Sequence, residues 1–133
     1  MWMAGILSVS NRPASAHVSA AEPLALSRVA HLGLVVRDAD VVARRWAEAF
    51  GVSRSPARSE GTDRRVTEIY FDNLTVEVSQ PSGGASIWSD FLNRHGEGIH
   101  HVAFEVPRVD DAVAALEKHG GRRVMGVSGP SVF

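Results

Sequence analysis

HHVAFEVPRVDDAVAALEKHGG, at residues 100–121, repeats the pattern of AHLGLVVRDADVVARRWAEAFG, at residues 30–51. The offset is 70 residues without a gap, and it places His31 on His101. Valine, aspartate and glycine identities follow at the same offset, with apolar and small residues matched between them. A repeat of this length is a supersecondary unit that occurs twice. We therefore expect a fold built from two similar modules.

Each copy begins with a β-rich run and continues with a helical pattern. In the first copy, Asp38 or Asp40 is suited to cap the helix, and Gly51 is suited to end it. In the second copy, Asp110 is the expected cap and a pair of glycines ends the helix. A linker and a short amphipathic helix, IWSDFLNRH, separate the copies. This order of strands and helices predicts an α+β protein.

A hairpin is predicted between the two copies, where RVTEIYF and LTVEVSQ flank Asp72 and Asn73. A two-residue turn at this pair fixes the register and places Glu68 directly opposite Glu77. Opposed side chains share a face, and like charges in that position destabilise the strand pair. We interpret the pair as the place of a positive charge, which a divalent cation would supply.

The adjacent histidines at 100 and 101 are expected to point to opposite faces of a strand. The repeat selects His101, because His31 aligns with it. Small residues on the same face, Gly33 beside His31 and Ala103 beside His101, are expected to leave room in front of each histidine. His31, Glu77 and His101 form the candidate metal site, with nitrogen and oxygen donors that suit Zn, Fe, Mn, Co or Ni. A pocket without metal is the alternative.

Composition limits the remaining possibilities. The chain has 133 residues, a formal net charge of -1 and no cysteine, which excludes disulfides and thiolate ligands. No basic stripe indicates nucleic acid, and no apolar run is long enough to span a membrane, so a cytoplasmic location is expected. Residues 1–28 are rich in Ala and Ser and are expected to form a flexible extension. Arg64 and Arg65 are expected on a solvated hairpin shoulder, or in contact with an anionic substrate.

Paired βαβββ modules with a histidine on the first strand of each resemble the vicinal oxygen chelate superfamily, which includes glyoxalases, bleomycin resistance proteins and dioxygenases. FLNRHGEGIHHVAFEV and LTVEVSQP are similar to segments of its methylmalonyl-CoA epimerases. The resemblance implies a curved mixed sheet around a cavity within a domain at residues 29–133. Its parts are module one (29–81), a linker and short helix (82–97) and an incomplete module two (98–133).

The resemblance also implies a function. His31, Glu77 and His101 match the metal-ligand positions, and Glu68 matches a proton-transferring base. The implied protein is a metal-dependent isomerase or epimerase that removes a proton next to a thioester or ketone carbonyl and stabilises the enolate. Its cofactor is a divalent metal ion, its substrate an acyl-CoA or similar carbonyl compound, and its assembly a homodimer. A glyoxalase-like lyase and a non-catalytic small-molecule binding or sequestration protein are the alternatives.

The second module departs from this pattern at its C-terminal end. The counterpart of Glu77 falls at position 147 on the offset of 70, beyond Phe133. That strand supplies the fourth ligand in the superfamily. Truncation, completion of the module by a partner chain, and loss of catalysis all remain open as interpretations.

Overall fold

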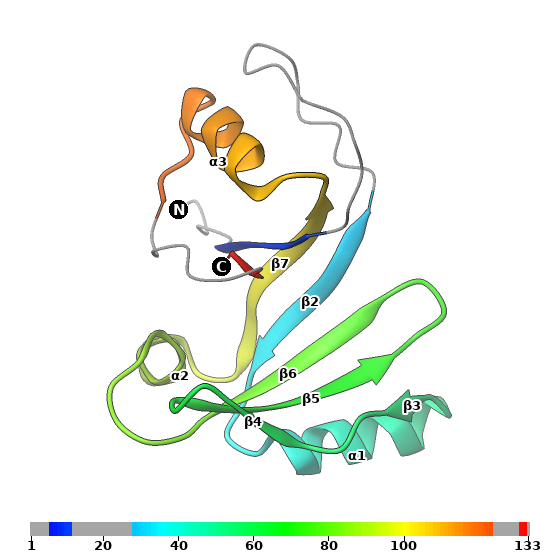
Figure 1. The fold of residues 1–133 in the computed structure, drawn as a ribbon. Coiled ribbons are helices and arrows are strands. Elements are labelled where there is room, and N and C mark those ends of the chain that lie inside the picture. Colours follow the sequence, from blue (N-terminus) through cyan, green and yellow to red (C-terminus); the bar gives the residue numbers. More distant parts are fainter. Residues whose placement is uncertain (1–5, 12–27, 124–130, 133) are drawn as a thin grey trace. The chain divides into compact units, whose positions relative to one another are not determined.

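A computed structural model describes residues 6–11, 28–123 and 131–132 of this chain (Figure 1). The predicted α+β class is confirmed. In chain order the elements are β1 (Ile6–Asn11), β2 (Val29–Val35), α1 (Ala39–Phe50), β3 (Ser53–Arg54), β4 (Arg58–Glu60), β5 (Arg64–Tyr70), β6 (Thr75–Pro81), α2 (Ile87–His95), β7 (Gly98–Val106), α3 (Val109–Lys118) and β8 (Ser131–Val132).

The chain divides into two compact units, one spanning His31–His101 and the other formed by the segments before and after it. In the first unit the strands follow the order β3-β5-β6-β2, and β4 also pairs with β5. β5 and β6 are antiparallel, whereas β2 and β6 are parallel. The predicted mixed sheet is therefore confirmed in this unit.

α1 covers one face of β5 and β6 (Figure 1). It begins at Asp38, whose carboxylate accepts a hydrogen bond from the Val41 backbone N–H. It ends at Gly51, which has a φ of 67° and so adopts the left-handed conformation that favours glycine. Both ends of α1 were predicted and are confirmed. The core beneath the helix contains Leu34, Val36, Ala39, Ala43, Ile69, Val76 and Val78.

The β5–β6 hairpin has the predicted register. Glu68 lies opposite Glu77, and the Phe71 backbone N–H donates to the Leu74 carbonyl across the turn at 2.9 Å. A two-residue connection leaves no slack in the pairing of the strands. The two glutamates are thus confirmed as neighbours on one face of the sheet.

The other unit includes the part of β7 from Val102 onward. β7 neighbours β1, and β1 pairs antiparallel with β8. The predicted cap of α3 is wrong, because the helix begins at Val109 and its N-cap is Arg108, which makes no capping hydrogen bond through its side chain. Asp110 therefore lies in the first helical turn, where its charge interacts with the helix dipole instead. The predicted glycine end is confirmed, since Gly120 has a φ of 89°.

Residues 1–28 were expected to form a flexible extension. Strand β1 lies within them, and residues 1–5 and 12–27 are outside the described part of the chain. Among the described residues, no helix is both long enough and apolar enough to cross a membrane.

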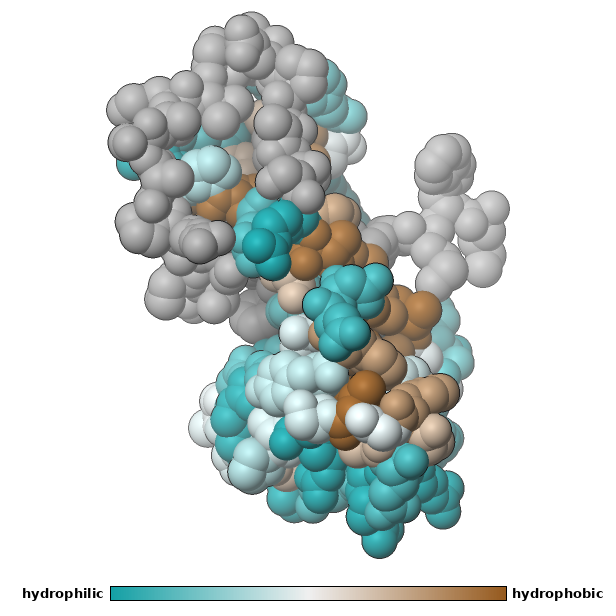
Figure 2. All heavy atoms as spheres, turned by 90° about the vertical axis from the view of Figure 1, so that its right-hand side faces the viewer, coloured by the Kyte–Doolittle hydropathy of each residue, from teal (hydrophilic) through white to brown (hydrophobic). Residues whose placement is uncertain are grey.

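Figure 2 shows one face of the molecule, on which hydrophobic and hydrophilic surface adjoin. Phe50, at the end of α1, is 59% exposed and contacts Phe71 of the hairpin turn, with 5.8 Å between ring centroids. This aromatic contact thus lies at the periphery of the core. Among the residues whose burial the structure describes, the other large hydrophobic ones with high exposure are Val29, Tyr70 and Ile99.

Candidate metal centre

The three predicted ligand residues meet within the unit His31–His101. His31 lies on β2, Glu77 on β6 and His101 on β7, and each offers one ligand atom within 4.8 Å of the others. The Nε2 atoms of the two histidines are 3.0 Å apart, and Glu77 Oε2 lies 4.0 Å from His31 Nε2. The parallel pairing of β2 with β6 brings the two strands into this register. Residues that are distant in the sequence therefore form one cluster.

Gly33 provides the space that the His101 ring occupies. A Cβ atom added at this glycine would lie 2.1 Å from His101 Cε1, which no real contact tolerates. His101 is only 2% exposed. Gly33 was expected to leave room in front of His31, and the structure shows instead that the ring of His101, on the neighbouring strand, fills this space.

Arg64 is part of the candidate site, so the predicted solvated shoulder is wrong for this residue. It is 3% exposed, and its Nη1 donates to Glu77 Oε1 at 2.8 Å and to Ser79 Oγ at 2.9 Å. Its guanidinium also lies 4.2 Å from the Trp88 ring centroid. Strand alternation explains this placement, because the side chain points to the same face of the sheet as Glu77.

Glu68 also has a cationic neighbour. Arg58 Nη2 donates to its Oε1 at 3.0 Å, and the Tyr70 hydroxyl donates to its Oε2 at 2.7 Å. Burial raises the pKa of this carboxyl, but the hydrogen bonds from Tyr70 and Arg58 outweigh it and hold the pKa below its ordinary value. Glu68 is therefore ionised at neutral pH.

The positive charge expected between the two glutamates thus comes from arginines. Arg64 neutralises Glu77, and Arg58 neutralises Glu68. A cation is consequently not needed to offset the like charges, and the case for a metal site rests on the ligand atoms alone.

Glu60 is a residue that the sequence analysis missed. It lies opposite Arg64 in the β4–β5 pairing, forms an ion pair with it, and lies 3.5 Å from Arg58 Nη2. A chain of alternating charges therefore runs from Glu77 through both arginines to Glu68. The alternation of Arg58 and Glu60 beside a charged strand was the available signal.

His100 packs against α2. Its ring centroid lies 4.8 Å from Trp88 and 4.9 Å from Phe91, and the residue is 9% exposed. The expectation that it diverges from His101 is wrong, because their centroids are 5.3 Å apart and their Nδ1 atoms 3.1 Å apart. Both rings lie near Trp88, so the start of β7 does not separate them as ideal alternation would.

Burial keeps both of these histidines neutral. It lowers the pKa of His100 to about 4 and the pKa of His101 to about 3, and the nearby positive charge of Arg64 acts in the same direction. A neutral imidazole is the form that binds a metal ion.

The donor set fits a divalent cation. Glu77 uses Oε1 for Arg64, which leaves Oε2 on the side of His31. Two imidazole nitrogens and this carboxylate oxygen are the donor types preferred by zinc and neighbouring transition metals. Three protein ligands of this kind leave coordination positions for a substrate.

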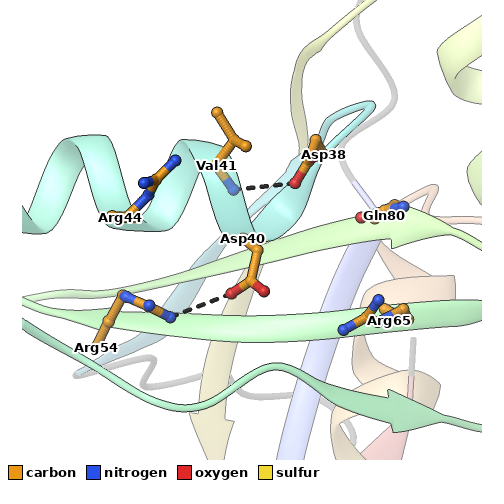
Figure 3. Close-up of a pocket in the computed structure, with 7 residues that line it drawn as sticks. All are labelled: Asp38, Asp40, Val41, Arg44, Arg54, Arg65 and Gln80. Atoms are coloured by element: carbon orange, nitrogen blue, oxygen red, sulfur yellow. Dashed lines mark hydrogen bonds and ion pairs between the residues drawn. The ribbon is translucent and has the colours of Figure 1, made fainter.

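A separate pocket of about 410 Å³ lies at the start of α1 (Figure 3). Arg65 and Gln80 line it, and along β5 and β6 they alternate with Arg64 and Glu77, which point to the side of the candidate site. The pocket is therefore on the opposite face of the sheet. Its other lining residues are Asp38, Asp40, Val41, Arg44 and Arg54, with Asp40 and Arg54 joined by an ion pair of 3.2 Å.

The α+β fold and the cluster of two histidines and one carboxylate agree with the pattern expected of the vicinal oxygen chelate superfamily. The chain belongs to the Glyoxalase/Bleomycin resistance protein/Dioxygenase superfamily, which it matches over residues 30–130. A search of curated proteins found no match.

Solved structures share the fold. Methylmalonyl-CoA epimerase from Mycobacterium tuberculosis is 20% identical with a TM-score of 0.67, over 76% of this chain and 69% of that chain. A Streptomyces coelicolor methylmalonyl-CoA epimerase variant, in complex with 2-nitronate-propionyl-CoA, is 22% identical with a TM-score of 0.66. The match covers 76% of this chain and 77% of that chain. A variant of 4-hydroxymandelate synthase from Streptomyces coelicolor is 21% identical with a TM-score of 0.66, over 74% and 31%.

Proposed function

We propose that this chain is a metal-dependent isomerase of the epimerase type, which moves a proton at a carbon next to a thioester or ketone carbonyl. The observation that carries the proposal is the cluster of His31, Glu77 and His101, whose ligand atoms lie within 4.8 Å of one another. The likeness of the fold to methylmalonyl-CoA epimerases supports the choice of reaction.

The residues divide into a binding set and a base. His31, Glu77 and His101 would hold a divalent cation, with Co, Zn, Mn, Ni and Fe all compatible with the donors. When bound, such a cation polarises a carbonyl and stabilises the negative charge that develops on proton removal. Glu68 lies directly opposite Glu77 and is the base of the proposal. Arg58 and Tyr70 fix the direction of its carboxylate and keep it ionised.

The substrate class of the proposal is an acyl-CoA or similar carbonyl compound. A solved epimerase of the same fold is in complex with methylmalonyl-CoA, which makes this thioester the first probe. A homodimer and a cytoplasmic location stay predictions.

The test is exchange of the substrate α-proton. The cobalt-loaded protein is incubated with methylmalonyl-CoA in D2O, and loss of the α-proton signal is followed by NMR. Glu68→Gln is expected to slow exchange about 100-fold or more while it retains cobalt, because general base catalysis is worth about 10²–10⁴. Glu48→Gln, an exposed change on α1, is the matched control. Exchange that is unaltered in Glu68→Gln refutes the role of this residue.

A glyoxalase-like lyase would use the same residues with a different substrate. A non-catalytic binding protein is the second candidate, and one observation favours it: both glutamates already have arginine partners, so the site is balanced in charge without a cation. Binding of a small molecule that survives a chelator and the change His31→Ala would identify this function. Loss of binding under both conditions would favour the enzyme.

A further inference from the structure

Three imidazole rings contact one another in a row within the unit His31–His101. His31 Nε2 lies 3.0 Å from His101 Nε2, and His101 Nδ1 lies 3.1 Å from His100 Nδ1. Both ring nitrogens of the central histidine are therefore engaged by another histidine.

The number of protons restricts the row of three histidines to two arrangements of its hydrogen bonds. A neutral imidazole carries one N–H donor and one acceptor nitrogen, and each contact needs one of each. If His101 donates at Nδ1, it must accept at Nε2. If it donates at Nε2, it must accept at Nδ1. The state of one contact thus determines the state of the other.

The surroundings favour one of these two directions. Glu77 Oε2 lies 4.0 Å from His31 Nε2, and a carboxylate favours a proton on the nitrogen that faces it. His31 then donates to His101 Nε2, and His101 donates from Nδ1 to His100 Nδ1. The far end of the chain is fixed, because Trp88 and Phe91 hold the ring of His100.

We propose that His100 is a positioning residue whose Nδ1 accepts the Nδ1–H of His101 and so presents the Nε2 lone pair of His101 to the cluster. This inference rests on the proposed metal site. Metal-bound histidines generally donate their second N–H to a neighbouring acceptor, which fixes both the tautomer and the ring orientation. The two adjacent histidines thereby have different tasks at one site, His101 as ligand and His100 as its support.

The positions of these protons mean that the two proposed ligand histidines differ in what must happen before a cation binds. His101 already presents the nitrogen that a cation needs. His31 must move its proton from Nε2 to its own Nδ1, with solvent as the carrier, before the Nε2 nitrogen can bind a cation. Support from His100 therefore acts on His101 alone.

The direct test is the tautomer of each histidine in the cation-free protein. Long-range 1H–15N NMR on the chelator-treated protein at pH 7.5 distinguishes a protonated Nδ1 from a protonated Nε2. We expect a protonated Nδ1 on His101 and a protonated Nε2 on His100. A protonated Nε2 on His101 would overturn the inference. This test needs no bound cation, so its result is independent of whether the proposed function holds.

Variants test the consequence for binding. His100→Leu removes the acceptor and is expected to weaken cobalt binding about 10- to 100-fold in calorimetry, as for other partners of ligand histidines. His100→Asn places an amide oxygen near the position of Nδ1 and should restore most of the affinity. Phe91→Leu is the control, because it loosens the packing of His100 but keeps the acceptor.

The outcomes separate the two proposals. Unchanged affinity in His100→Leu, or an equal loss in Phe91→Leu, would show that His100 serves packing only. Absence of cobalt binding in the wild type would refute the proposed metal site, and the NMR tautomer would still decide the direction of the histidine chain.

Discussion

Arg64 is the residue that most changes the interpretation of the site. It is buried with Glu77 and supplies the positive charge that this glutamate requires, while Arg58 supplies it for Glu68. Buried charge pairs contribute modestly as pairs, but the loss of one partner leaves a charge without solvent.

We therefore expect Arg64→Met to lower the free energy of unfolding by about 3 kcal/mol, because Glu77 loses its cationic partner. Urea denaturation measures the effect. Arg65→Met is the matched control. Arg65 is the exposed neighbour of Arg64, so its replacement should change stability by less than about 0.5 kcal/mol. Equal effects in both variants would mean that the Arg64–Glu77 pair is not important for the fold.

The contact of Gly33 with His101 leads to a second prediction. Gly33→Ala forces a methyl group into the His101 ring, so we expect a loss of about 1–3 kcal/mol in stability and of cobalt binding. Gly98→Ala, on β7, meets no atom within 4 Å and serves as control. Calorimetry and urea denaturation on both variants check the expectation, and wild-type cobalt affinity in Gly33→Ala would contradict it.

The buried histidines predict how stability depends on pH. His100 and His101 stay neutral in the folded state, whereas their unfolded forms take up protons below about pH 6.5. The unfolded state thus binds more protons as the pH falls, and stability decreases from pH 6.5 toward the folded pKa values of about 4 and about 3.

Each histidine contributes a slope of up to about 1.4 kcal/mol per pH unit in this window. Urea denaturation of the chelator-treated protein between pH 5 and 7.5 measures the slope. Carboxylates such as Glu68 change stability with pH in the same direction, so the wild type is compared with His100→Asn. The free energy of unfolding of this variant is expected to depend less steeply on pH, because one titrating group is gone. An identical slope in this variant would contradict the neutral state of His100.

The sequence predicted that His31, Glu77 and His101 lie together, because the histidines follow from a repeat and Glu77 follows from the register of a hairpin. It did not predict the contact of His100 with His101, since that contact depends on side-chain rotamers at the start of β7. The sequence predicted a solvated Arg64 because a position at the end of a strand does not show whether its side chain is buried. Glu60 was missed because its strand has only three residues, too few for the alternation of Arg58 and Glu60 to identify a strand.

At the scale of elements, helix caps separate a correct prediction from a wrong one. Asp38 accepts a hydrogen bond from a backbone N–H in the first turn of α1, whereas Asp110 lies inside the first turn of α3. The observed N-cap of α3 is Arg108, and this shift of two residues is enough to move Asp110 out of the cap position.

Asp38→Ala should therefore lower the free energy of unfolding by about 1 kcal/mol, because it removes the cap. Asp110→Ala should cost only a few tenths of a kcal/mol, about the value of a charge near the helix dipole. Thermal or urea denaturation compares the two variants. A larger cost for Asp110→Ala would show that this residue serves as the cap after all.

Turn chemistry made the hairpin the most predictable element. Asp72 and Asn73 fix a two-residue turn, so the register of β5 and β6 follows from the sequence. The short strands β3 and β4 could not be predicted, since two or three residues carry neither alternation nor a hydrophobic run.

The internal repeat explains why the chain as a whole has the organisation of its superfamily. It predicted an α+β chain of two modules, and the superfamily match over residues 30–130 is consistent with that organisation. The ligand atoms of the candidate site lie within a single unit, His31–His101. Cation binding is therefore expected to need only residues of this unit.

The proposed metal site consists of His31, Glu77 and His101, and a calorimetric titration with Co(II) measures whether these residues bind a cation. The chelator-treated full chain is titrated alongside His101→Ala and Glu77→Gln, with Glu97→Gln, an exposed carboxylate elsewhere in the unit, as control. We predict one cobalt ion per chain in the wild type and the control, and a loss of binding in both cluster variants. No binding in the wild type, or equal binding in all four proteins, would contradict the account.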